Sequence, residues 1–193
     1  MILAIDTSSA RAGVALLDGS GAVLQEQLHA SGRSLNLPGI YRALAAGVPL
    51  TKVAVATGPG SFTGLRTGVS FALGLAMGFG IPIVPLGTLS IQAARAGEPV
   101  IAVAEAGRGR VYYQAGSGGP GLAEPAELPA GLAVVGWLRP ATEESMRTAG
   151  LVMKPEAELL TFGAAVARLL EAAPEAPYGS LKIHYMQSIS APA

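Results

Sequence analysis

The segment from Thr57 to Gly80, TGPGSFTGLRTGVSFALGLAMGFG, constrains the fold more than any other part of the chain. It follows the apolar run Val53–Ala56, whose length and β-branched residues are typical of a buried strand. The residues Gly58, Pro59 and Gly60 then end the strand with a sharp turn, and Ser61 is a suitable N-cap for a helix that runs to about Phe79. The segment therefore predicts a strand, a glycine turn and a long helix.

The predicted helix 61–79 contains many small residues. Gly64 and Gly68 lie four residues apart, and Ser70, Gly74 and Gly78 continue the small-residue spacing. Each interior glycine costs a helix about 0.5–1 kcal/mol relative to alanine, so several of them indicate that another backbone packs closely against the helix. We expect the helix to be buried on most sides, as the central helix of the fold, as a subunit interface, or as both.

The glycine turn has two interpretations. It is either a tight connection without a ligand or a phosphate site, because backbone N–H groups at a helix N-terminus attract anions. The turn lacks the lysine of GxxxxGK[ST], so it is not a Walker A loop. Asp6, followed by small hydroxyl residues at the end of a predicted strand, is either part of a metal–phosphate site or a turn cap, and the cap is favoured. The candidate phosphate- or nucleotide-binding residues are Asp6, Gly58, Gly60 and Ser61.

The composition narrows the class of protein. A chain of 193 residues with 50% hydrophobic content can bury a sizeable core, as one large domain or two small ones. Its 13 basic and 13 acidic residues give no net charge and no long basic run, so strong autonomous nucleic-acid binding is not expected. The chain has no cysteine, which excludes disulfides and thiolate chemistry, and its two histidines, His29 and His184, do not form a metal-binding pair.

The N-terminus does not resemble a signal peptide, because Asp6 interrupts a short apolar run that has no basic start. The most apolar segment, residues 69–83, is short for a membrane span and rich in glycine. We therefore expect a soluble cytoplasmic protein that does not associate with a membrane.

The order of predicted elements divides the chain into two sections of an α/β fold. Residues 1–97 predict the order β-β-β-α-β-α-β-α, in which helices 34–46 and 61–79 are the longest. Residues 98–193 predict a shorter section with strands over 100–104, 111–115 and 132–135, a loop over 116–129, helices over 142–148 and 156–171, and an extended tail from Ala172.

Two motifs resemble the TsaB (YeaZ) family: Ile2-Leu3-Ala4-Ile5-Asp6-Thr7-Ser8, and Thr57–Arg66 followed by Gly68. The runs Gly87-Thr88-Leu89 and Gly109-Arg110-Val111-Tyr112 also fit. The resemblance implies an actin/Hsp70/sugar-kinase-like (ASKHA) fold with an N-terminal lobe of residues 1–97 and a shortened second lobe of residues 98–193. It also implies a bacterial accessory subunit in making N6-threonylcarbamoyladenosine at position 37 of tRNA.

The resemblance further implies that the chain is not the catalyst, since the catalytic paralogue TsaD holds a metal through a histidine pair. The implied partners are a TsaD-type subunit, a TsaE-type ATPase, a second copy of the chain when it is alone, and tRNA only through the complex. No cofactor of its own is implied, and ATP or ADP with Mg²⁺ at a subunit junction is left open. The helices 34–46 and 61–79 would bind partners, through Leu37, Tyr41, Leu44, Gly64, Arg66, Gly68 and Gly74.

An enzyme is the competing hypothesis: a phosphotransferase or ATPase of the sugar-kinase-like fold. Asp6 would position Mg²⁺, the turn 58–61 would hold phosphate, Glu105 would be the second acidic group, and the residues 107–109 would form a second phosphate loop. A glycoprotease has little support, because neither histidine lies in a motif. Arg66 is predicted either to pair with a partner's carboxylate or to be solvated, and Trp137 to pack in the core.

Overall fold

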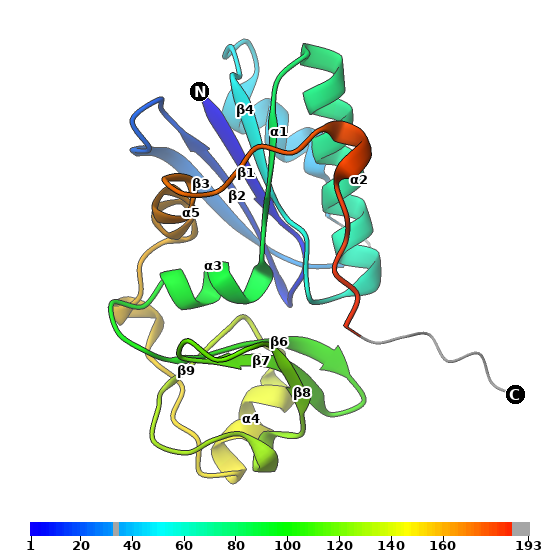
Figure 1. Ribbon diagram of the computed structural model, residues 1–193. Helices are drawn as coiled ribbons and strands as arrows, with labels where there is room; N and C mark the ends of the chain where they lie inside the picture. The colour runs from blue at the N-terminus through cyan, green and yellow to red at the C-terminus, as the bar shows by residue number, and fades with distance from the viewer. Residues whose placement is uncertain (33–34, 187–193) are drawn as a thin grey trace, which may run out of the picture.

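The computed structural model describes residues 1–32 and 35–186, and this part of the chain forms two β-sheets with helix α3 between them (Figure 1). The first sheet has the strand order β3-β2-β1-β4-β5, with antiparallel pairing among β1, β2 and β3 and parallel pairing of β4 with β1 and β5. The predicted order β-β-β-α-β-α-β-α is confirmed. Its elements are β1 (Ile2–Asp6), β2 (Arg11–Leu17), β3 (Val23–Ala30), α1 (Leu37–Ala45), β4 (Lys52–Ala56), α2 (Phe62–Phe79), β5 (Ile83–Leu86) and α3 (Thr88–Ala94).

Strands β1, β2 and β4 of the first sheet have buried side chains on both faces, since successive side chains of a strand point to opposite faces. Leu3 and Ile5 of β1 belong to a core that includes buried residues of α1 and α2. Ala4 belongs to a second core on the opposite face, with Ile91 of α3 and Phe162. This arrangement explains why β1 and β4 are short apolar runs, whereas β3 at the edge of the sheet contains polar residues and is mostly exposed.

Helix α1 begins three residues later than predicted. Its N-cap is Asn36, whose Oδ1 accepts a hydrogen bond from the backbone N–H of Gly39 at 3.0 Å. Ser34, where the predicted helix 34–46 begins, and its neighbour Arg33 lie outside the described residues.

Helix α2 has the predicted bounds, but within the chain it is not buried on most sides, and burial at a subunit interface stays a prediction. Ser61 caps its start and Gly80, with a φ of 66°, ends it. One face is buried against the first sheet, whereas Gly74 and Gly78 are exposed and have no neighbouring heavy atom within 4 Å of an added Cβ. Met77 and Phe79 are also exposed, by 63% and 55%. The small residues near the C-terminal end therefore make an open surface rather than a close contact within the chain.

The second sheet has the strand order β8-β7-β6-β9. Its face toward α3 carries Ala102, Ala104 and Tyr112, which pack with Leu89 of α3. Its other face packs against Met146 of α4. The predicted loop 116–129 contains a short strand that pairs with β7, and the predicted strand 132–135 is reduced to two residues. The elements are β6 (Ile101–Gly107), β7 (Arg110–Ala115), β8 (Gly121–Ala123), η1 (Pro125–Glu127), β9 (Val134–Val135) and α4 (Pro140–Thr148).

The predicted helix 156–171 is wrong, because this segment forms the short 3-10 helix η2 (Glu156–Glu158) and a separate helix α5 (Phe162–Leu170). Thr161 caps α5 through a hydrogen bond from Ala164 N at 3.3 Å. Glu26 of β3 accepts the N–H groups of Phe162 and Gly163 at 3.2 and 2.7 Å, which places a carboxylate at the positive end of this helix. Helix α5 thus packs on the first sheet, and the division into residues 1–97 and 98–193 stays a prediction.

The C-terminal segment also returns to the first sheet (Figure 1). Ala176 forms a bridge with Ile83 of β5, and the hydroxyl of Tyr178 donates to the carbonyl of Ile81 at 2.7 Å. The segment contains the 3-10 helix η3 (Tyr178–Ser180), so it is not extended throughout as predicted. Further on, His184 N donates to the carbonyl of Thr57 at 2.8 Å. Among the helices of the described residues, none is both long enough and apolar enough to cross a membrane.

Candidate functional site

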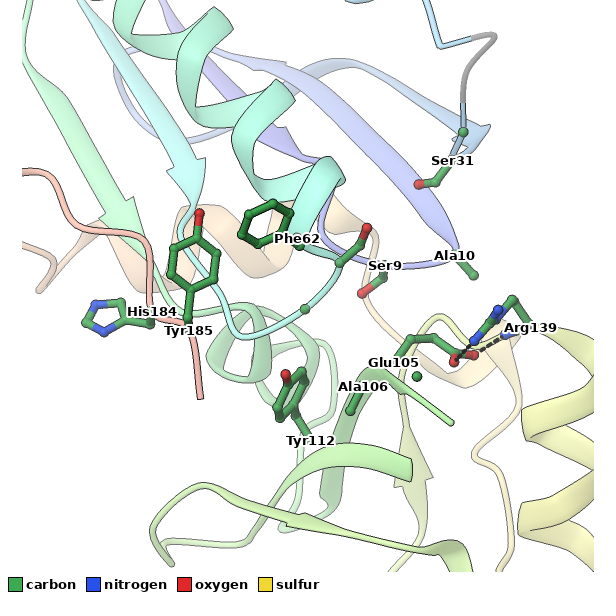
Figure 2. Close-up of a pocket in the computed structure, with 14 residues that line it drawn as sticks. Ser9, Ala10, Ser31, Phe62, Glu105, Ala106, Tyr112, Arg139, His184 and Tyr185 are labelled. Carbon is green, nitrogen blue, oxygen red and sulfur yellow. Dashed lines mark hydrogen bonds and ion pairs between the residues drawn. The ribbon is translucent and has the colours of Figure 1, made fainter. Parts of the chain in front are cut away.

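A cleft of about 580 Å³ opens where the ends of the first-sheet elements face the β6–β7 hairpin and the start of α4 (Figure 2). Gly60 and Ser61 line it at the start of α2, as do Glu105 and Gly107 of β6. The structure therefore brings together the glycine turn and the second-section residues that the enzyme hypothesis singled out. Side chains that the sequence analysis did not assign to a site also line the cleft: Ser31, Phe62, Tyr112, Arg139 and Tyr185.

Asp6 lies buried behind this cleft rather than on its surface. Its Oδ1 accepts hydrogen bonds from Ser8 N at 2.8 Å and from Ser8 Oγ at 2.6 Å. The carbonyl of Ser8 in turn accepts the N–H of Ser61 at 2.7 Å. Asp6 thus has the geometry of a turn cap, and it fixes the loop against which the N-terminus of α2 is held.

The pKa of Asp6 is raised above its ordinary value because burial disfavours the charged form more than the Ser8 hydrogen bonds favour it. The folded state therefore keeps a proton that the unfolded state loses above pH 3.8. The resulting stabilisation is fully present below that pH and is lost as the pH rises through the raised folded pKa.

We expect Asp6→Asn to remove this part of the pH dependence without lowering the stability at neutral pH. Asparagine keeps a carbonyl oxygen for both Ser8 hydrogen bonds and cannot ionise. Urea denaturation of both proteins from about pH 4 to pH 8 measures the effect. An equally steep decline of stability in both proteins would contradict the assignment of a raised pKa to Asp6.

Two other predicted site glycines are required by contacts within the chain. A Cβ on Gly58, whose φ is 116°, would lie 2.7 Å from the carbonyl oxygen of His184. A Cβ on Gly60 would lie 2.4 Å from the carbonyl oxygen of Ser8. The tight-turn interpretation accounts for both glycines, and phosphate binding at this turn stays a prediction.

Glu105 is engaged by the start of α4. Its Oε1 accepts the backbone N–H of Arg139 at 2.8 Å, and its Oε2 accepts Arg139 Nη2 at 2.7 Å. Burial would raise the pKa of Glu105, but hydrogen bonds from Arg139 and Thr142 and the charge of Arg139 lower it overall. The carboxylate is therefore ionised and satisfied by its own chain. Within residues 1–32 and 35–186, no three acidic or histidine side chains are grouped so that they could hold a metal.

The predicted partner-interface residues occupy different environments. Leu37 and Leu44 are buried in the core under α1, and Tyr41 packs edge-on against Phe71 with 6.2 Å between the ring centroids. A side chain in the core offers no surface to a partner, so Leu37 and Leu44 would act only by shaping α1. Gly74, by contrast, lies on the open face of α2.

The close packing predicted from Gly64 and Gly68 is present, but it is made with the chain's own β1–β2 loop. A Cβ on Gly64 would lie 2.0 Å from the carbonyl oxygen of Thr7, and one on Gly68 would lie 2.3 Å from Thr7 Oγ1. Thr7 Oγ1 also donates to the carbonyl of Gly64 at 2.7 Å. These two glycines let α2 sit on the loop that Asp6 caps.

Arg66 is not simply solvated, because it has partners within the chain, and its pairing with a partner's carboxylate stays a prediction. Its guanidinium lies 3.7 Å from the centroid of the Phe62 ring, and its Nε donates to the Tyr185 hydroxyl at 3.2 Å. The rings of Phe62 and Tyr185 are 5.2 Å apart and lie side by side at one edge of the cleft (Figure 2). The sequence places Phe62 and Arg66 together at the start of the glycine-rich helix, but it gives no signal for Tyr185. This residue is 119 positions from Arg66.

Comparison with known proteins adds an independent line of argument. The family model described as tRNA N6-adenosine threonylcarbamoyltransferase, TsaD, matches residues 38–120. The tRNA threonylcarbamoyladenosine biosynthesis protein TsaB of Haemophilus influenzae is 37% identical over 122 residues, which are 58% of this chain and 52% of the relative. The protein of the same name from Bacillus subtilis is 37% identical over 120 residues, again 58% of this chain and 52% of the relative.

The matched region thus spans about half the length of these curated relatives. The solved structure of YeaZ from Pseudomonas aeruginosa aligns over 96% of this chain and 99% of that chain, with a TM-score of 0.71 at 24% identity. This similarity establishes the shared fold. The motifs at β1 and at the start of α2, the matching relatives and the shared fold agree, and together they support a relationship of this chain to the TsaB/YeaZ family.

Proposed function

We propose that the chain is a non-catalytic scaffold subunit of the machinery that makes N6-threonylcarbamoyladenosine at position 37 of tRNA, and that it binds and supports a TsaD-type catalytic subunit. The relatives named tRNA threonylcarbamoyladenosine biosynthesis protein TsaB support the pathway. We further propose that the two sheets correspond to the two lobes of an ASKHA fold, with the division near residue 97 and a shortened second lobe.

The observation that carries the scaffold role is the open face of α2. Exposed residues recur at helical spacing along this face, from Thr63 through Ser70 and Gly74 to Met77. Small side chains allow a partner helix to approach closely, and exposed apolar residues such as Met77 and Phe79 favour burial on association. We propose this face for the TsaD-type subunit and, when the chain is alone, for a second copy of the chain. A TsaE-type ATPase would join the complex.

The enzyme alternative fits this chain less well. A nucleotide-bound Mg²⁺ requires carboxylates with free oxygens. Both oxygens of Glu105 are occupied by Arg139. Asp6 has one oxygen, Oδ2, without a hydrogen-bond partner among the described residues, but this oxygen is buried and Asp6 does not line the cleft. These residues do not fit a nucleotide–Mg²⁺ site made by this chain alone, and no step of the proposed function passes through one. ATP or ADP at a junction with another subunit is compatible with the proposal.

Reconstitution of the modification tests the proposal. We expect tRNA, threonine, bicarbonate and ATP, supplied with the enzyme that makes the threonylcarbamoyl donor and with the TsaD- and TsaE-type proteins, to yield modified adenosine only when this chain is added. The chain without the TsaD-type protein is expected to yield none. Nucleoside analysis by mass spectrometry gives the readout. Modification that proceeds equally well without the chain would contradict the scaffold role.

A further inference from the structure

The charges of this neutral chain are unevenly distributed. Arg139, before α4, lines the cleft, and three further exposed or half-exposed arginines lie next to residues that line it. Arg66 on α2 contacts Phe62 and Tyr185, and Arg108 and Arg110 are at the β6–β7 turn. Gly107, which lines the cleft, is next to Arg108 in the chain. Tyr112, which also lines the cleft, is two residues after Arg110, so these two side chains share a face of β7. The acidic residue at the cleft, Glu105, is bound to Arg139.

The arginines near the cleft differ from one another in their partners, since within residues 1–32 and 35–186 only Arg139 of the four is paired with a carboxylate. Among the described residues, no carboxylate forms an ion pair with Arg66, Arg108 or Arg110. Away from the cleft, Lys52, Arg95, Arg147 and Lys154 each pair with a glutamate, whereas Arg42 and Arg168 form no ion pair among the described residues. Unpaired guanidinium groups are available for phosphate oxygens, which they bind with good geometry.

An aromatic platform accompanies these charges. Arg66 stacks on Phe62, Phe62 lies against Tyr185, and the ring of Tyr185 remains 45% exposed at the cleft. Exposed aromatic rings beside arginines are the usual stacking surface for unpaired bases. Ser31 Oγ, which lies at the cleft, is buried without a hydrogen-bond partner among the described residues, so it can bond a ribose hydroxyl or a base edge.

The cleft continues into a second hollow of about 490 Å³, which shares Ala10 and Arg139 with it. Arg11, which also forms no ion pair with a carboxylate of the described residues, and His29 line this second hollow. Glu143 lies there too, and it pairs with Arg147 at 3.6 Å. Two adjoining hollows with a cation in each suit several linked phosphates, whereas a free mononucleotide would occupy only one of them.

We propose that this two-part groove binds a short single-stranded segment of RNA, with phosphates on Arg11, Arg66 and Arg110 and a base on Tyr185. The proposal rests on the proposed function, in which the substrate is a tRNA, and it adds a direct contact between this chain and the RNA.

Fluorescence anisotropy of a labelled single-stranded RNA of about 12 nucleotides with the purified chain tests the proposal directly. We expect a Kd tighter than about 100 µM at low salt, and a log–log salt slope of about −2, as for three phosphates of a single strand. Arg110→Glu and Arg11→Glu should each weaken binding at least about fivefold and flatten the slope by about 0.7. The matched control is Arg168→Glu, which reverses an exposed charge on α5 and should leave binding unchanged.

Absence of RNA binding by the chain would overturn the proposal, as would equal losses in Arg168→Glu and Arg110→Glu. Displacement of the RNA by ATP at a concentration equal to that of unlabelled RNA would also overturn it, since this result indicates a mononucleotide site. Association of each variant with the TsaD-type protein is measured in parallel. A variant that loses RNA binding but still associates with the TsaD-type protein shows that the two functions are separate. Failure of this inference can therefore be told apart from failure of the scaffold role.

Discussion

Gly64→Ala is expected to lower the free energy of unfolding by about 3 kcal/mol, although alanine is the better helix former. The added Cβ would lie 2.0 Å from the carbonyl oxygen of Thr7, and this backbone atom belongs to the loop held by Asp6 and Ser8. Relief of the overlap requires α2 and the loop to separate, which disrupts the hydrogen bond from Thr7 Oγ1 to Gly64. Urea denaturation gives the value.

The matched control lies ten residues further along the same helix. Gly74 has no heavy atom within 4 Å of an added Cβ, so Gly74→Ala should gain about 0.5–1 kcal/mol from helix propensity alone. If Gly64→Ala lowers the free energy of unfolding and Gly74→Ala raises it, the two ends of the glycine series have different roles. A loss of stability in Gly74→Ala similar to that in Gly64→Ala would contradict the position of α2 on the β1–β2 loop.

Gly74→Leu is expected to weaken association with the TsaD-type subunit at least about tenfold, corresponding to about 1.4 kcal/mol, while the chain itself stays folded. A leucine on the open face of α2 would hold a partner helix away from the surface that the small residues offer. Gly68→Leu is unsuitable for this purpose, because its Cβ would meet Thr7 Oγ1 at 2.3 Å and damage the fold.

Gly97→Leu is the control for the assembly experiment. Gly97 is exposed, lies outside α2 and has no heavy atom within 4 Å of an added Cβ. It should bind the TsaD-type subunit as the unmodified chain does. Equal affinity in Gly74→Leu and the unmodified chain would remove the open face of α2 from the proposed interface.

Local sequence patterns predicted much of the first section correctly. The apolar runs of β1 and β4 and the turn before α2 each depend on neighbouring residues, so their elements could be read directly. The break before α5 was missed, because the apolar pattern of residues 156–171 is helical throughout. The chain instead begins a new helix at Phe162, because Thr161 caps its start and Glu26, 136 positions before Phe162, accepts the N–H of that residue.

The site was less accessible from the sequence for the same physical reason. The ion pair between Glu105 and Arg139 and the stack of Phe62 with Tyr185 join residues that are far apart in the chain. The glycine spacing in α2 predicted a close contact but not its partner. The sequence does not distinguish a glycine that packs against the chain's own loop, such as Gly64, from a glycine that faces solvent, such as Gly74.

The scaffold role is tested most directly by size-exclusion chromatography with light scattering, on the chain alone and after mixing with its cognate TsaD-type protein. We expect a homodimer alone and, on mixing, a heteromeric complex of defined mass that takes the place of the homodimer, because both associations use the open face of α2. Unchanged elution of both proteins after mixing, at concentrations well above micromolar, would contradict this expectation.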